Sequence, residues 1–163
     1  MPSPPSGSIH RWAEDDYDVT DDPRAVDLDI VQSFLANDSY WAMGRSREEQ
    51  ARANELSTCF SVLHMPDREF VGFARVLSDD VGFGWVADVF ILEPHRGRGV
   101  GVFLMRCVVE SFQQKQMTAV IHNNDDNSRA TLFGLGLRCG RDFLRGVQRE
   151  HFFHGQLRLR CKG

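Results

Sequence analysis

The sequence has few cysteines and no long hydrophobic run. Its 163 residues include four cysteines, no two of which are spaced as Cys-x-x-Cys. Because no apolar signal segment is visible either, we expect a reducing, cytoplasmic setting in which disulfides do not hold the fold. No run approaches the roughly 20 apolar residues that cross a bilayer, so we expect no membrane contact.

Positive charge is not in excess. The chain carries 19 lysines and arginines against 23 aspartates and glutamates, a formal net charge of −4. This balance argues against a general nucleic-acid surface, and we expect no nucleic-acid partner. The six histidines are scattered, and no cysteine or carboxylate falls at a recognised ligand spacing beside them, so we expect no metal site.

No internal repeat or low-complexity block divides the chain. With 42% hydrophobic residues, a chain of this length can bury a core as one domain. Residues 1–10 are rich in proline and serine, which predicts a flexible tail, and residues 11–163 then form the single domain. Monomer and homodimer both stay open.

Capping residues predict two helices early in the chain. Asp22 followed by Pro23 is typical of an N-cap and first helical position, and apolar residues repeat at helical spacing to about residue 36. A second helix is predicted to begin at Ser46, which forms a capping-box pattern with Glu49, and to end near residue 56.

Strands and helices alternate in the rest of the chain. The patterns predict a hairpin, a third strand, a helix, a fourth strand, a short helix and two last strands, over residues 58–64 with 70–77, 85–92, 99–112, 117–122, 127–135, 148–153 and 156–161. This order predicts an α/β fold, a mixed sheet with helices on both faces. Cys107 lies on the apolar stripe of the longer helix, and we expect a core residue there rather than a nucleophile.

A turn rich in glycine and arginine joins the third strand to that helix. It reads Pro94-His95-Arg96-Gly97-Arg98-Gly99-Val100-Gly101. Main-chain amides without side-chain cover can close on a pyrophosphate, the start of a helix favours negative charge, and arginines add charge-assisted donors. The turn therefore predicts a phosphate-bearing cofactor, with an ordinary basic surface turn as the alternative. Its spacing fits neither a dinucleotide-binding turn nor a Walker loop.

The spacing Arg96-x-x-Gly99-x-Gly101 resembles the acyl-CoA signature R/Q-x-x-G-x-G/A of the GNAT superfamily, the acyl-CoA-dependent N-acyltransferases. Four upstream strings are also similar to small stand-alone bacterial-type members: Tyr40-Trp41-Ala42-Met43-Gly44-Arg45-Ser46, Cys59-Phe60, Val71-Gly72-Phe73-Ala74-Arg75-Val76 and Ala87-Asp88-Val89-Phe90. The resemblance covers about residues 25–137. It implies a GNAT-like sheet flanked by helices, with acetyl-CoA as the cofactor.

The resemblance also implies which residues hold the cofactor. The pyrophosphate would lie on the turn, at Arg96, Gly97, Arg98, Gly99, Val100 and Gly101. Main-chain groups of Val89, Phe90 and Ile91 would run along the pantetheine arm like an added strand. Asn127 would bond the pantetheine from the opposite wall.

An amine can attack an acyl thioester directly, so such an enzyme must orient the two, accept a proton and stabilise the oxyanion. Asp88 is the candidate base, because a carboxylate inside the apolar run 86–91 would be costly to bury without a purpose. The alternative is structural: Asp88 caps a neighbouring backbone group or pairs with Arg75. For the acceptor, the aromatic candidates are Tyr40, Trp41, Phe83 and Trp85, with a place in the core as their alternative.

One departure from the family pattern concerns the acid that protonates the thiolate. Many members carry a tyrosine where this chain has Leu132 or Phe133, and its only tyrosines are Tyr17 and Tyr40. Water, the ammonium product, Tyr40 or Cys139 could take that role, or catalysis could be lost. The predicted function is acetyl transfer from acetyl-CoA to a primary amine of a small molecule or peptide. The alternative is a weakly active or inactive acyl-CoA-binding sensor or interaction module.

Overall fold

The computed structural model describes residues 8–39, 42–81, 83–114, 118–122 and 156–159. They contain one seven-stranded sheet whose strands lie side by side in sequence order. The strands are β1 (Arg11–Glu14), β2 (Tyr17–Thr20), β3 (Thr58–His64), β4 (Glu69–Ser78), β5 (Phe83–Ile91), β6 (Thr118–His122) and β7 (Gln156–Leu159). Only β5 and β6 are parallel among these described neighbours, so the sheet is mixed.

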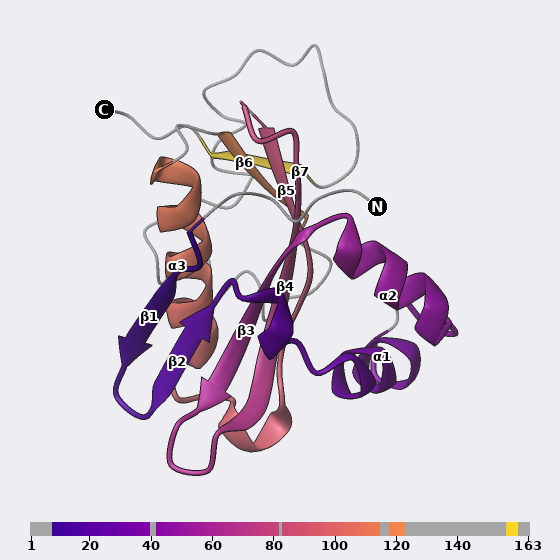
Figure 1. Cartoon of the computed structure of the whole chain (residues 1–163), viewed down its shortest axis with the longest axis vertical. Helices are drawn as coiled ribbons and strands as arrows, with labels where there is room; N and C mark the ends of the chain where they lie inside the picture. The colour runs from indigo at the N-terminus through magenta and orange to yellow at the C-terminus, as the bar shows by residue number, and fades with distance from the viewer. Residues whose placement is uncertain (1–7, 40–41, 82, 115–117, 123–155, 160–163) are drawn as a thin grey trace.

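Helices cover both faces of the sheet (Figure 1). α3 (Val100–Gln114) lies on one face, whereas α1 (Leu28–Asn37) and α2 (Arg47–Glu55) lie on the other. Two 3-10 turns connect strands to helices, η1 (Pro23–Ala25) before α1 and η2 (Glu93–His95) before α3. The predicted α/β fold with helices on both faces is confirmed.

Each face of the sheet has its own hydrophobic core. On the α3 side, the predicted helix stripe is buried against the sheet through Val100, Phe103, Leu104, Cys107 and Val108. On the other side, α1 buries Val31 and Leu35 against strand residues such as Phe73 and Phe90. Phe34 stacks on Phe90 with ring centroids 4.0 Å apart, which fixes α1 over the end of β5.

The first predicted helix is two elements in the structure. The Asp22 carboxylate accepts from the Arg24 N–H and begins η1, as predicted, but Val26 is extended and ends it after one turn. A new helix, α1, begins with Asp27 as N-cap, accepting from the Ile30 N–H at 3.0 Å. The apolar spacing runs unbroken through the joint, which is why periodicity alone predicted one helix.

The hairpin of β1 and β2 was not predicted. Its strands have four residues each, and the buried strand β2 includes the polar Asp18 and Thr20, which hides the alternation typical of strands. Both polar side chains have partners: Asp18 pairs with Arg11 of β1, and the Thr20 hydroxyl donates to the His10 carbonyl at 2.8 Å. Paired polar groups can be buried without a large penalty.

The other predicted elements within the described residues agree with the structure. α2 has both bonds of the capping box between Ser46 and Glu49, and β3 has the predicted bounds. The predicted helix over 127–135, the strand over 148–153 and most of the N-terminal tail lie outside the described residues. None of the helices described is long and apolar enough to span a bilayer.

The core under α3 provides a stability prediction. Leu104 is fully buried, so Leu104→Ala should lower the free energy of unfolding by about 2–5 kcal/mol, because methyl groups are lost and a cavity remains. Leu56 is 60% exposed, and the same truncation there should change it by about 0.5 kcal/mol or less. Urea unfolding followed by circular dichroism measures both, and equal losses would contradict the assigned core.

Candidate functional site

A row of unpaired main-chain N–H groups lies between η2 and α3. The last bond of η2 runs from the Arg96 N–H to the Glu93 carbonyl at 3.1 Å, and the first bond of α3 runs from the Phe103 N–H to the Gly99 carbonyl at 3.0 Å. From Gly97 to Val102, no main-chain N–H donates to any residue that the structure describes. Adjacent free donors at the start of a fifteen-residue helix are the geometry that binds anions.

Glycine makes this geometry possible. Gly97 and Gly99 have φ of +73° and +81°, in the left-handed region that other residues adopt at a cost. A Cβ built on either would meet no atom within 4 Å, so the turn is open on its outer side. Arg96 and Arg98 are both exposed there, and the Arg96 Nε donates to the Ile91 carbonyl at 2.8 Å. Residues 96–101 are called the anion loop below.

The anion loop is anchored from behind by a buried histidine. His95 is 8% exposed, and its Nδ1 lies 3.0 Å from the hydroxyl oxygen of Tyr17 on β2. The two rings also meet edge to face, with centroids 5.8 Å apart. The loop therefore starts from a fixed point in the core, an anchor that sequence reasoning did not identify.

β5 is interrupted by a bulge just before it reaches the anion loop. Phe73 of β4 pairs with Phe90, but Arg75 pairs with Ala87, so Asp88 and Val89 together oppose one residue of β4. Asp88 has φ of +53°, a conformation that aspartate tolerates better than most residues. β6 pairs with β5 only over residues 83–86 among the described residues. Beyond the bulge, β5 has no described partner on that edge.

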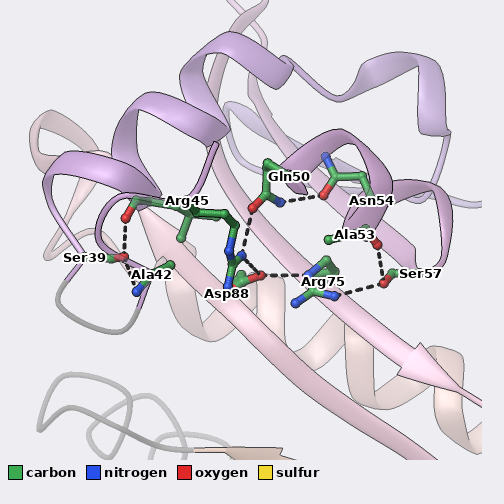
Figure 2. Close-up of polar contacts among 10 residues, drawn as sticks. Ser39, Ala42, Arg45, Gln50, Ala53, Asn54, Ser57, Arg75 and Asp88 are labelled. Carbon is green, nitrogen blue, oxygen red and sulfur yellow. Dashed lines mark hydrogen bonds and ion pairs between the residues drawn. The ribbon is translucent and has the colours of Figure 1, made fainter. Parts of the chain in front are cut away.

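The bulge places the Asp88 carboxylate against two arginines (Figure 2). Its Oδ2 accepts from the Nε of Arg75, on β4, at 2.7 Å and from the Nη1 of Arg45, in the loop before α2, at 2.9 Å. Asp88 is 6% exposed and Arg75 is 8% exposed. Pairing with Arg75 was one of the two alternatives for Asp88 from the sequence, and Arg45 was not foreseen.

Residues of α2 and of the short segment after it bind the two guanidinium groups. The Arg45 Nη1 also donates to the Oε1 of the buried Gln50 at 2.8 Å, and the Gln50 amide donates to Asn54 at 2.7 Å. The Arg75 Nη1 donates to the Ser57 hydroxyl at 3.1 Å. Figure 2 shows these side chains converging from β4, β5 and the two ends of α2.

A pocket of about 490 Å³ opens beside this network. Its described lining comes from the loop before α2, from α2 and from β4: Ala42, Met43, Gly44, Arg45, Glu49, Ala53 and Arg75. The hydrogen bond from the Ser46 N–H lowers the pKa of the Glu49 carboxyl, so this side chain is anionic near neutral pH. Two cations and one anion thus face a small cavity next to the bulge.

Comparison with known proteins identifies the family. Residues 8–133 match the model described as the Acetyltransferase (GNAT) family. The chain belongs to this family.

Individual GNAT relatives agree with this assignment. A Gibberella zeae protein named as a candidate acetyltransferase is 28% identical over 159 residues, covering 84% of this chain and 89% of the relative. A candidate GNAT acetyltransferase from Xanthomonas campestris pv. campestris has a solved structure with TM-score 0.67 and 26% identity, covering 86% of this chain and 96% of that one.

A third relative was crystallised with a ligand. The structure of a GNAT acetyltransferase from Elizabethkingia anophelis contains bound acetyl-CoA. The alignment has a TM-score of 0.52 and 15% identity, and it covers 91% of this chain and 89% of that one. At this identity the comparison shows a similar fold.

All but one of the residues that the GNAT resemblance assigns to the cofactor lie within residues 89–101, on the end of β5 and in the anion loop. Val89, Phe90 and Ile91 follow the bulge, and the anion loop begins after the short turn η2. Phe90 is buried, whereas Val89 and Ile91 are half-buried against the core under α3. Asn127 lies outside the described residues.

The aromatic acceptor candidates are placed only in part. Tyr40, Trp41 and the side chain of Phe83 lie outside the described residues. Trp85 is half-buried, pairs with Leu77 of β4, and is absent from the described lining of the pocket. None of the described lining residues had been predicted as a site residue. Arg45, which also binds Asp88, stands in the string 40–46 that carried the resemblance.

Among the described residues, the fold also brings together three side chains of the kinds that bind metal ions. Their spacing in the sequence did not reveal this group. His64, Asp67 and Glu69, at the turn between β3 and β4, place ligand atoms within 4.8 Å of one another. The His64 Nδ1 already lies 2.9 Å from Asp67, and the two carboxylates are exposed. The hydrogen bond between the His64 ring and the Asp67 carboxylate accounts for the approach of these two groups.

The two described cysteines are core residues. Cys59 and Cys107 are both buried free thiols, and burial raises the pKa of each to about 12. Cys107 contributes to the core under α3, which agrees with the expectation of a packing residue.

This burial predicts resistance to alkylation. Ordinary thiols have pKa near 8.5, so at about pH 8 an accessible cysteine reacts with iodoacetamide. Cys59 and Cys107 should stay protonated and unmodified in the folded protein at that pH, and both should react once urea unfolds it. Peptide mass spectrometry of the native and unfolded samples measures the difference, and rapid native labelling of either cysteine would contradict its placement.

Proposed function

We propose that this GNAT protein transfers an acetyl group from acetyl-CoA to a primary amine of a small molecule or peptide. The single observation that carries the proposal is the row of N–H groups from Gly97 to Val102 that have no partner among the described residues. It follows closely on the end of β5, whose edge also lacks a described partner. The acetyl-CoA bound in the Elizabethkingia relative supports the choice of cosubstrate. Residues 11–163 would act as one domain, in the cytoplasm, as a monomer or homodimer.

The anion loop suits a pyrophosphate in charge and in shape. Its N–H groups and the helix dipole of α3 favour negative charge, and the exposed Arg96 and Arg98 add charge-assisted donors. The empty space outside Gly97 and Gly99 lets phosphate oxygens approach the backbone. Val100 and Gly101 would supply further N–H groups at the first turn of the helix.

The edge of β5 beyond the bulge suits the pantetheine arm. Residues 89–91 pair with β4 on one side, through Phe90 and Ile91, and have no described strand on the other. An amide-containing chain can add to such an edge through main-chain hydrogen bonds, with Asn127 as a partner on the opposite wall. The thioester would then lie near Asp88 and the pocket.

The reaction requires the amine and the thioester to be oriented toward each other, and it requires no protein nucleophile. The amine nitrogen attacks the thioester carbonyl, a C–N bond forms, the C–S bond breaks, and the amine loses one proton while the thiolate leaves. A free amine with pKa near 10.4 is neutral in only about one molecule per thousand at pH 7, so a proton acceptor should matter. A main-chain N–H of residues 89–91 could face the developing oxyanion.

The acid for the thiolate is not Tyr17. Its hydroxyl is bonded to His95 in the core under α3, on the opposite face of the sheet from the pocket. Thiols have pKa near 8.5, so the thiolate is a tolerable leaving group without an acid, and Tyr40, Cys139, water or the ammonium product stay as candidates. The missing family tyrosine favours the second candidate function, an acyl-CoA sensor or interaction module with little or no turnover.

The anion loop gives the test of cofactor binding. Arg96→Ala combined with Gly99→Asp should abolish stabilisation by CoA, since a cation is lost and an anion is placed among the free N–H groups. For the unchanged protein, a ligand at a hundredfold excess over Kd adds about 2.7 kcal/mol to the free energy of unfolding. Thermal unfolding with and without CoA measures this difference.

A matched control makes the same changes of charge elsewhere. Val81 is 78% exposed in the turn between β4 and β5, and Arg52 is exposed on α2, and neither lines the pocket. Val81→Asp with Arg52→Ala therefore changes the charge equally, and it should keep the response to CoA. A full response in the Arg96/Gly99 variant would refute the anion loop as the CoA site.

The role of Asp88 can be tested by removing its negative charge. As the proposed base, Asp88→Asn should slow acetyl transfer by about 10²-fold or more while leaving CoA affinity nearly intact. Proton acceptance at Oδ2 would require an ion pair with Arg45 or Arg75 to open, so a positioning role is the competing interpretation.

The pH dependence separates the two roles of Asp88. Loss of a base removes the acidic limb of the kcat/KM profile, whereas loss of a positioning group lowers the whole profile and preserves its shape. Circular dichroism controls for folding, since removing one partner of a buried ion pair can cost about 3–5 kcal/mol. An unchanged rate would exclude Asp88 from the mechanism.

A further inference from the structure

Two guanidinium groups line the pocket, and one buried carboxylate beside it binds both of them. Arg45 and Arg75 share one oxygen of that carboxylate, Asp88 Oδ2. Glu49, the other carboxylate at the pocket, has its pKa lowered mainly by the Ser46 N–H and to a lesser extent by the charge of Arg45, and it forms no ion pair with either arginine. Burying a guanidinium group is costly unless its donors are paired, so donors left unused in the protein favour an anionic ligand.

Arg75 still has donors to offer after its protein contacts are made. Its Nε binds Asp88 and its Nη1 binds Ser57, but within the described part of the chain its Nη2 has no hydrogen-bond partner. The residue is more than nine-tenths buried, yet it lines the pocket. A nearly buried guanidinium group that lines the pocket therefore keeps an unused donor.

Arg45 also keeps unused donors. Its Nη1 makes both hydrogen bonds of the guanidinium group, to Asp88 and to Gln50, so Nε and Nη2 have no partner among the described residues. Because Gln50 is itself fully buried and bonded to Asn54, the guanidinium has few alternative positions. Two oriented forks with unused N–H donors match the geometry that binds carboxylates.

Glu49 indicates what else the ligand carries. This exposed carboxylate lines the same pocket, at the first turn of α2. A purely anionic ligand would be repelled by it, whereas a ligand with an ammonium group at one end and an anion at the other would meet opposite charges at both ends. An amine acceptor arrives mostly as the ammonium ion at neutral pH.

We propose that this pocket recognises the carboxylate of the amine acceptor through Arg45 and Arg75, so that the substrate is a small amino acid rather than a simple amine. The proposal rests on the acetyltransferase function above and narrows its substrate class. A volume of about 490 Å³ suits a small molecule. In either role of Asp88, its Oδ2 holds the two guanidinium groups in place, and the carboxylate of the substrate would accept from their unused donors.

The test compares amines that differ only in the acidic group. Acetyl transfer is measured by CoA release with β-alanine against β-alaninamide and with 4-aminobutyrate against 4-aminobutanamide, at equal concentrations of neutral amine. The carboxylate member of each pair should have kcat/KM higher by about tenfold or more, as expected for a charge-assisted hydrogen bond. The same pairs are titrated calorimetrically into the CoA complex, where the carboxylates should bind more tightly.

Arg45 is the position to change, because Arg75 and Asp88 keep their ion pair without it. Arg45→Gln should lower kcat/KM for the carboxylates by about tenfold and leave that for the carboxamides nearly unchanged. Arg45→Lys should restore part of the preference, since it keeps the charge but loses the fork. The control is Arg47→Gln, an exposed arginine two residues on that pairs with Asp29 outside the pocket.

The other outcomes would contradict either the carboxylate site or the proposed function as a whole. Equal use of carboxylates and carboxamides, or a preference that survives Arg45→Gln, overturns the carboxylate site and leaves the acetyltransferase proposal standing. If CoA binds but no amine is acetylated, equal binding of both members in the calorimeter overturns the site. If the protein fails to bind CoA at all, the proposed function fails, and the substrate class fails with it.

Discussion

The candidate site depends on one buried carboxylate. Asp88 occurs at the point where β5 leaves regular pairing with β4, and its Oδ2 binds Arg75 from β4 and Arg45 from the loop before α2. A strand, its neighbour and a helical layer thus meet at a single atom. Since an unpaired charge at this depth would be strongly unfavourable, the bulge, the loop and α2 are constrained to keep their relative positions.

The two faces of the sheet carry different parts of the proposed site. On one face, α3 is packed by the core that includes Leu104 and presents its unpaired N–H groups at the anion loop. On the other face, α1 and α2 cover the core around Phe73 and border the pocket. β5 connects these regions, because Asp88 in its bulge binds the two arginines that line the pocket and its last residue leads into the turn before the loop.

Sequence patterns predicted the elements that a few neighbouring residues determine. The capping box of Ser46 and Glu49, the hairpin and the glycine turn are each specified by a few adjacent residues, and each occurs in the structure where the sequence placed it. The break at Val26 was missed because apolar spacing continues across it, and the β1–β2 hairpin because its buried polar residues find their partners only in the folded chain. Arg45 was missed for the same reason: 43 positions separate it from Asp88, and no sequence pattern measures that contact.

The hydrogen bond between Tyr17 and His95 links residues 78 positions apart. It attaches the turn in front of the anion loop to β2, a strand that a reader of the sequence would regard as a dispensable extension. The first strands of the described chain therefore support the proposed cofactor site. A shortened version of this protein that starts at η1 would keep every residue of the loop and still lose the support that sets its shape.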